Sequence, residues 1–207
     1  MHSSGVRLQN TFGFFTTVTF FVAALTALSA LLYPSSPTAN INLRNVKVRT
    51  GRPHYTSTKP QEYLLINFDL DADLTSLFNW NTKQVFAYLT VLYNSPSASS
   101  SPSKYTENEM ILWDTIIPDV RSAKLHLVNE QAKYKANDIT GKFAERNATV
   151  RFEWNVQPHV GVLYWGSIEA DAEGNVVRKV EEGRRGKWGF QIPPAWGKKP
   201  VVKKTAV

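Results

Sequence analysis

The residues of this chain best suited to acid–base chemistry are its four histidines, His2, His54, His126 and His159. A serine hydrolase would need one of them beside a serine and a carboxylate. His54 and His159 each follow a proline and are expected in loops, and His126 falls on the polar face of a predicted strand. The chain contains neither His-Glu-x-x-His nor Gly-x-Ser-x-Gly. A triad is defined by geometry, so a hydrolase stays open, but the pattern favours structural or solvated histidines.

A second group that could do chemistry is the acidic run Asp69, Asp71 and Asp73. Carboxylates in series suggest Ca²⁺, but a calcium loop needs more oxygen ligands and usually a glycine for its turn. Here the run leads directly into Leu74 and Leu77. We therefore expect Asp71 or Asp73 to cap a short helical turn rather than to bind a metal.

Cysteine is absent from the sequence. This excludes thiol catalysis, zinc–thiolate sites and iron–sulfur clusters, and it means that packing alone must hold any domain together. The chain also lacks a glycine-rich loop of the kind that cradles phosphate. We expect no cofactor and no metal.

One uncharged stretch near the amino terminus predicts a membrane anchor, which would hold the rest of the chain beside a bilayer. No Asp, Glu, Lys, Arg or His occurs between Arg7 and Arg44, and residues 12–33 are largely apolar. As a helix with about 1.5 Å rise per residue, these residues reach roughly 33 Å, enough for a bilayer core of about 30 Å. The competing interpretation is a cleaved signal peptide, whose apolar region is only about 7–15 residues long. We predict a short amino terminus (1–11) and a retained transmembrane signal-anchor (12–33) that contacts the lipid bilayer.

The orientation of this anchor rests on two conflicting signals. Basic residues are more numerous on the carboxy side, where Arg44, Lys47, Arg49 and Arg52 follow, than on the amino side with Arg7. Counted alone, they would place the carboxy side in the cytosol. Against this, a long following domain translocates largely regardless of charge, and Asn147-Ala148-Thr149 is a glycosylation acceptor. We expect a cytosolic amino terminus and a lumenal carboxy domain.

Short strand-like runs follow the anchor. Leu64, Ile66, Phe68 and Leu70 alternate with polar residues, as do Val150, Phe152, Trp154 and Val156. Residues 83–93 are apolar on both faces and are expected at the centre of a sheet. Residues 95–103 are rich in Ser and Pro and are expected to form a mobile loop. Short strands separated by turn signals predict a mainly β fold, an antiparallel β-sandwich over 34–196.

The net charge of +7 is concentrated near the carboxy end. An anionic partner such as lipid headgroups or RNA would fit, but like-charged tails are usually solvated. We favour a solvated basic tail over 197–207 and expect no nucleic-acid partner. The basic residues concerned are Arg184, Arg185, Lys187, Lys198, Lys199, Lys203 and Lys204.

Several blocks of the sequence resemble the signal peptidase complex subunit 3 family. The blocks fall in order and span most of the chain, and together they are highly specific. The Ser/Pro insertion near 95–103 and the basic tail after Trp196 depart from the family pattern without interrupting a block. The matching blocks are Phe68-Asp-Leu-Asp-Ala-Asp-Leu74, Leu77-Phe-Asn-Trp-Asn-Thr-Lys-Gln-Val-Phe-Ala-Tyr88, Trp113-Asp-Thr-Ile116, Arg146-Asn-Ala-Thr-Val-Arg-Phe-Glu-Trp-Asn-Val-Gln-Pro158 with Gly161, and Phe190-x-x-Pro193.

The resemblance implies a noncatalytic, single-pass (type II) subunit of the endoplasmic reticulum membrane with a lumenal β-sandwich. In this family the serine nucleophile and its base lie in another chain, the protease subunit that removes signal peptides, which would be the partner together with the other membrane subunits of the complex. The resemblance also implies N-glycosylation at Asn147.

Trp80, Asn81, Lys83 and Gln84 lie in a matching block at a strand entry and are our candidate residues for contact with the protease subunit. Equally, Trp80 could serve the fold alone as a core or hairpin residue. Two other classes remain open from the residues: a membrane-anchored hydrolase, and a free-standing lumenal binding module for a peptide or glycan.

Overall fold

A computed structural model describes most of the chain, and the segments that it leaves out include several positions discussed above. It describes residues 3–52, 55–56, 58–96, 105–170, 176–179 and 190–195. His2, His54, most of the Ser/Pro segment (97–103), the basic residues of 181–189, Trp196 and the tail 197–207 lie outside the described residues.

The chain begins with a long helix, α1 (Ser4–Ser29), which a 3-10 turn (Ala30–Leu32) extends to Tyr33. The helix has no buried residue and is long and apolar enough to cross a bilayer. It starts eight residues before the apolar run because the Ser3 hydroxyl caps it by accepting the Val6 N–H at 3.4 Å.

The threonines of α1 are compatible with lipid, because their hydroxyls donate to backbone carbonyls four residues earlier. The Thr16 hydroxyl, for example, lies 2.8 Å from the carbonyl oxygen of Phe12, and that of Thr19 lies 2.9 Å from the carbonyl of Phe15. Such bonds satisfy the hydroxyls inside the helix and leave no donor to be buried unpaired in hydrocarbon.

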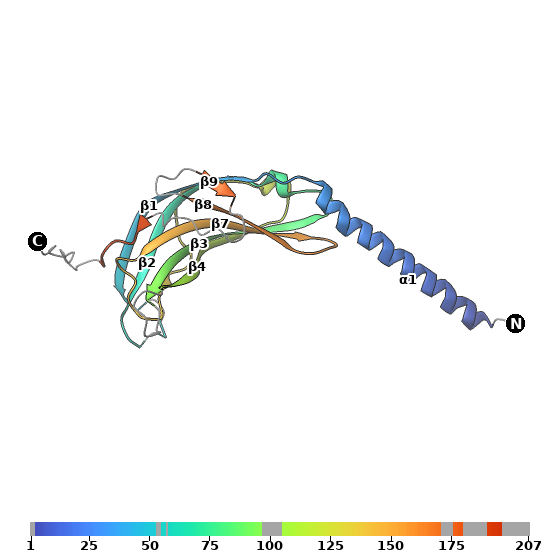
Figure 1. Ribbon diagram of the computed structural model, residues 1–207, viewed down its shortest axis with the longest axis horizontal. Coiled ribbons are helices and arrows are strands. Elements are labelled where there is room, and N and C mark those ends of the chain that lie inside the picture. The colour runs from blue at the N-terminus through green and yellow to red at the C-terminus, as the bar shows by residue number, and fades with distance from the viewer. Residues whose placement is uncertain are drawn as a thin grey trace, which may run out of the picture.

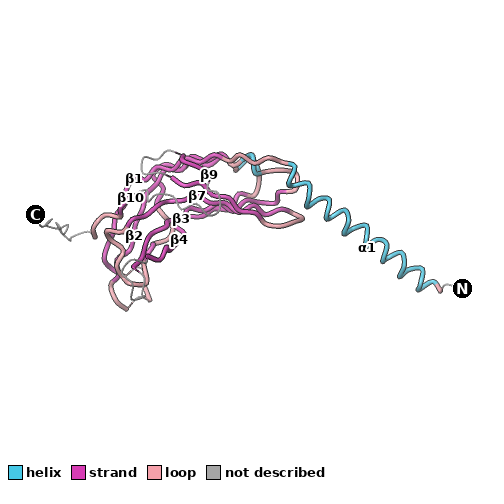
Figure 2. The backbone as a smooth tube through the Cα atoms, in the orientation of Figure 1, coloured by secondary structure: helices cyan, strands magenta, loops and turns pink. Residues whose placement is uncertain are grey.

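The rest of the described chain forms two antiparallel sheets, which confirms the predicted mainly β fold (Figures 1 and 2). The four-stranded sheet has the order β1-β2-β5, with β6 also paired to β2. The six-stranded sheet has the order β4-β3-β7-β8-β9, with β10 paired to β7. The strands are β1 (Thr38–Gly51), β2 (Gln61–Asp73), β3 (Thr82–Pro96), β4 (Tyr105–Ile117), β5 (Lys124–Gln131), β6 (Ala136–Asn137), β7 (Asn147–Pro158), β8 (Tyr164–Ala170), β9 (Val176–Lys179) and β10 (Phe190–Gln191).

Two 3-10 turns, η2 (Thr75–Leu77) and η3 (Val120–Ser122), complete the described elements. Helix α1 projects from one end of the β domain (Figure 1). As predicted, β3 is central, because it pairs with both β4 and β7.

A bulge in β1 explains why its sequence alternates imperfectly. Leu43 lies opposite Phe68 and Asn45 opposite Asn67, so Arg44 is an extra residue in the ladder. The extra residue shifts the inward positions by one, and its guanidinium Nε lies 2.6 Å from Oδ2 of Asp69 on β2. One member of the acidic run is therefore used for an ion pair across neighbouring strands.

The inward faces of both sheets share one hydrophobic core. Leu64, Ile66 and Phe68 of β2 are fully buried, as their alternation predicted. The Phe68 ring meets the Trp113 ring of β4 edge to face, with centroids 6.1 Å apart, which joins the two sheets.

Trp154 of β7 occupies a space that only glycine leaves open. Its cross-strand partner on β8 is Gly166, and a Cβ built on Gly166 would lie 2.4 Å from the Trp154 ring. Trp154 is only 3% exposed, as its place in the alternating pattern predicted. The indole of Trp154 lies across the β8 backbone at Gly166, and this packing requires both the large ring and the absence of a side chain opposite it.

We predict that Trp154→Ala lowers the free energy of unfolding of the detergent-solubilised chain by about 3–5 kcal/mol, because it leaves a cavity between the sheets. Denaturant unfolding followed by circular dichroism measures this. Trp165→Ala, a change of the same size at a residue that is 64% exposed, is the control. A loss below about 1 kcal/mol for Trp154→Ala would show that the indole is peripheral to the core.

Candidate interaction site at the end of the helix

A tight turn between η2 and β3 presents the first of the candidate interface residues. Asn79 Oδ1 accepts the Asn81 N–H at 2.9 Å, and the Asn79 carbonyl accepts the Thr82 N–H at 3.0 Å. The Thr82 hydroxyl closes the turn by donating to the Leu77 carbonyl at 2.9 Å. An asparagine that folds back on its own backbone is typical of such turns. Trp80 lies at the exposed tip and is 59% accessible.

Asn81 points inward and holds the hairpin between β7 and β8. Its Nδ2 donates to the Val160 carbonyl at 2.7 Å, its Oδ1 accepts the Val160 N–H at 3.1 Å, and its own carbonyl accepts the His159 N–H at 2.7 Å. These three hydrogen bonds link the two segments in the way that backbone bonds link paired strands. Asn81 is only 2% exposed, and removing its side chain would take away the partners of both backbone groups of Val160.

The same hairpin packs on the last turns of α1. Gly161 has φ +129°, and a Cβ built there would lie 3.3 Å from Cβ and 3.5 Å from Cα of Ala27. The position therefore favours glycine both for its backbone conformation and for its closeness to the helix. The linker after the helix is held as well, because the Ser36 N–H donates to the Ser76 hydroxyl at 3.2 Å. The helix and the β domain thus meet at a junction made by the η2–β3 turn, the β7–β8 hairpin and Ser36.

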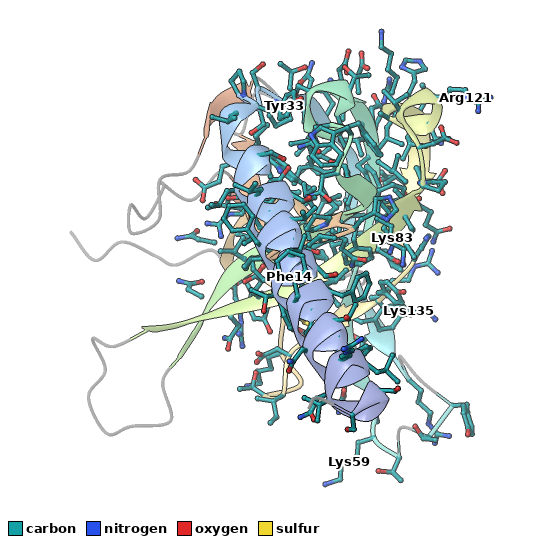
Figure 3. The ribbon with its side chains drawn as sticks, turned by 90° about the vertical axis from the view of Figure 1, so that its right-hand side faces the viewer. Phe14, Tyr33, Lys59, Lys83, Arg121 and Lys135 are labelled. Atoms are coloured by element: carbon teal, nitrogen blue, oxygen red, sulfur yellow. The ribbon has the colours of Figure 1, made fainter. Side chains whose placement is uncertain are left out.

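The four candidate interface residues therefore have different surroundings. Trp80 and Lys83 are exposed and available to a partner, whereas Asn81 is internal. Gln84 is half-buried, and its Nε2 donates to Oε1 of Gln157 across the neighbouring strand at 2.7 Å. Contact of these residues with a partner stays a prediction, and Asn81 can act there only by positioning its neighbours. Figure 3 shows Tyr33 at the carboxy end of the helix and Phe14 nearer its amino end.

The acceptor Asn147 lies at the other end of β7 from this junction. The strand has 12 residues, so roughly 36 Å of extended chain separates Asn147 from Pro158. Asn147 is exposed, whereas Thr149, which completes the acceptor triplet, is only 6% exposed. An oligosaccharide on Asn147 would therefore lie far from the helix end.

A buried polar network holds the loop that leads into Asn147. Asp138 accepts the Tyr93 hydroxyl at 3.0 Å and pairs with Arg146, whose Nη2 lies 3.0 Å from its Oδ2. Burial raises the pKa of the Asp138 carboxyl, but hydrogen bonds from Thr140 and the charge of Arg146 outweigh it and leave the pKa below its usual range. Asp138 is thus ionised at neutral pH and ties the loop to β3.

A second polar cluster crosses the outer face of the six-stranded sheet. The Tyr88 hydroxyl donates to Glu153 at 2.9 Å, and the Arg151 guanidinium pairs with both Glu153 and Glu169. Burial, together with the charge of Glu109, raises the pKa of the Glu153 carboxyl. These groups pair with one another across neighbouring strands, although the buried Nε of Arg151 has no hydrogen-bond partner among the residues that the structure describes.

The histidines that the structure describes lie on different sheets. His126 is on β5, opposite Asp71 in the register of the four-stranded sheet, and His159 is in the hairpin of the other sheet. Within the described ranges, no group of three or more His, Asp or Glu residues is arranged to hold a metal. Of the acidic run, Asp73 accepts the N–H and hydroxyl of Thr75, the first residue of η2, but the N-cap position of that turn is Leu74 and not Asp71 or Asp73 as expected.

This geometry defines a class of protein, a β-sandwich docked on the end of one long apolar helix. A family model described as "Signal peptidase subunit" matches residues 1–178. The chain therefore belongs to the signal peptidase subunit family, as its sequence blocks predicted.

Individual relatives support the same assignment. Signal peptidase complex subunit 3 of Yarrowia lipolytica is 39% identical over 180 residues, covering 82% of this chain and 94% of that protein. The Saccharomyces cerevisiae protein of the same name is 41% identical over 146 residues, covering 68% and 73%. The Homo sapiens protein is 35% identical over 126 residues, covering 60% and 63%.

The sequence placed Trp80 at a strand entry, just before β3 begins at Thr82, but it did not predict the junction. Gly161 matches a family block, and nothing local shows that Asn81 binds a loop 79 residues away. The available signal was the isolated glycine in Pro158-His-Val-Gly161, which marks a tight turn or a close approach.

We predict that Asn81→Ala loosens the hairpin, because the N–H and the carbonyl of Val160 lose two hydrogen bonds, each of which contributes about 0.5–1.5 kcal/mol. Hydrogen exchange of the Val160 amide should become faster. Gln84→Ala, which removes a side-chain bond on the same strand without touching the hairpin, is the control. Unchanged exchange at Val160 in Asn81→Ala would contradict the role of this side chain as a clamp.

Proposed function

We propose that this chain is a noncatalytic, structural subunit of the endoplasmic reticulum signal peptidase complex. It supports the serine-protease subunit that cleaves signal peptides, and it contacts that subunit and the other membrane subunits. The family assignment and the names of the relatives support membership of the complex. The two histidines that the structure describes lie on different sheets, and the polar groups of the two clusters above are paired with one another, which favours a supporting role over a catalytic one.

In the proposed topology, residues 12–33 span the membrane, the amino terminus is cytosolic and the β domain is lumenal. One feature supports this orientation. The acceptor Asn147 is exposed and lies at the end of β7 opposite the helix.

The junction is the observation that carries the positioning role. A domain on a free linker would sample many heights and tilts, but here the hairpin touches Ala27 and the linker is bonded at Ser36. A domain fixed in this way can hold a neighbouring protease at a set height above the bilayer. Small displacements of reacting groups matter, since a misplacement of about 1 Å can cost on the order of 100-fold in rate.

Membership and orientation can be tested together by measuring the mass of the detergent-extracted complex before and after glycosidase treatment. We expect the chain to migrate in a stoichiometric assembly with the protease subunit and to lose mass on deglycosylation. Asn147→Gln should remove that mass change and leave the assembly intact. If the chain migrates without partner subunits, a free-standing binding module is favoured. If Asn147→Gln still loses mass on glycosidase treatment, Asn147 is not the acceptor.

The candidate interface is tested by Trp80→Ala and Lys83→Ala. Both side chains are exposed, so neither substitution should change the free energy of unfolding by more than about 0.5 kcal/mol. An exposed Trp at the centre of an interface typically contributes 2 kcal/mol or more, so copurification of the protease subunit should fall for Trp80→Ala.

Tyr134→Ala is the matched control, because Tyr134 is 50% exposed and lies outside the junction. Full copurification with folded Trp80→Ala would remove Trp80 from the interface.

A further inference from the structure

The tip of the β7–β8 hairpin exposes an unusual amount of apolar surface. Val162 is 85% exposed, Leu163 43% and Val160 39%, and Trp165 just behind them is 64% exposed. Isolated exposed apolar residues are ordinary, but four of them within six residues of one hairpin form a patch. None of them contributes to the core shared by the two sheets.

The junction fixes the depth of this hairpin relative to α1. Gly161 lies against Ala27, six residues before Tyr33. At about 1.5 Å per residue, the contact is about 9 Å below the Tyr33 end of the apolar run. If residues 12–33 span the bilayer, the hairpin tip lies at the level of the lumenal acyl chains and not above the headgroups. In Figure 1 the β7–β8 hairpin reaches toward α1 at the end of the domain from which the helix projects.

The charge pattern of the hairpin agrees with that depth. No Asp, Glu, Lys or Arg occurs between Glu153 and Glu169, a stretch that contains the whole tip. The backbone of the tip is partly satisfied by protein, since Asn81 binds both the N–H and the carbonyl of Val160. Both features suit irregular backbone near hydrocarbon, where charged side chains and unpaired polar groups are costly. Trp165 at the base of the hairpin fits the headgroup level, where Trp is enriched.

We infer that residues 159–163 enter the lumenal leaflet of the bilayer beside α1 and form a second membrane contact of the β domain. This inference rests on the proposed span of α1. The helix and the hairpin then hold the domain at two points, which fixes its tilt as well as its height. The partner is the acyl-chain region of the lipid, not a charged headgroup, because the tip has exposed apolar side chains and no Asp, Glu, Lys or Arg.

Depth-dependent quenching tests the inference with the full-length chain. Because the chain has no cysteine, Val162→Cys gives a single attachment site for the fluorophore NBD. The labelled protein is reconstituted in phosphatidylcholine vesicles. We expect a lipid with a nitroxide high on its acyl chain to remove most of the fluorescence, and iodide supplied on both sides of the membrane to remove little.

Two matched variants separate this inference from the proposed topology. Phe14→Cys reports the span itself and should be quenched by lipid. Ile139→Cys reports an apolar residue that is 98% exposed, in the loop bonded to the start of β2, and should be quenched by iodide.

If the Phe14 label is quenched by lipid but the Val162 label is quenched by iodide, the inference is overturned while the anchor stands. Shielding of the Val162 label from both quenchers also overturns it, because protein would then cover the tip. If iodide reaches the Phe14 label, the proposed span itself is wrong.

Discussion

The close approach of Gly161 to Ala27 is the contact on which the relation of helix to domain depends. It requires a small residue on the helix and a glycine in the hairpin, whose φ of +129° few other residues adopt. Asn81 holds the hairpin in place by three hydrogen bonds, so the contact does not rest on apolar packing alone. Without this junction, the β domain would be tied to the helix only by the short linker at residues 33–37.

Polarity changes along the domain in a way that suits the proposed topology. The β7–β8 hairpin at the helix end has no Asp, Glu, Lys or Arg, whereas the opposite end holds the Asp138–Arg146 pair and the exposed Asn147. Between them, the outer face of the six-stranded sheet bears the cluster of Tyr88, Arg151 and Glu153. The apolar surface of the hairpin does not extend over the whole helix end, because Lys83 and the Asp73–Lys124 pair lie on other strands at the same end.

Strands and the helix could be predicted from the local pattern of apolar and polar residues. Features that depend on contacts between distant residues could not. Period-2 alternation predicted the buried residues of β2 and β7, and an uncharged apolar run predicted α1. The break in alternation around Arg44 was visible, but its cause is a bulge that only strand pairing defines. Likewise, Asn81 looked like a surface residue of an interface, because a turn asparagine carries no local sign of a partner 79 positions away. Trp80 and Lys83 are exposed, as a partner interface requires, but exposure alone does not test their contact with a partner.

Strands β3 and β7 connect the junction to the rest of the domain. Both β3 and β7 have one end at the junction, at Thr82 and Pro158, and the two strands pair along most of their length. They are buried on their inner face, and Trp154 lies across Gly166 of the adjoining strand. Paired and packed strands resist local bending, so in the proposed role a displacement at the hairpin is passed on to the sheet. A change of about 1 Å in the docking of the hairpin on α1 would therefore be carried to any partner held on this sheet, which is the scale on which catalytic geometry is lost.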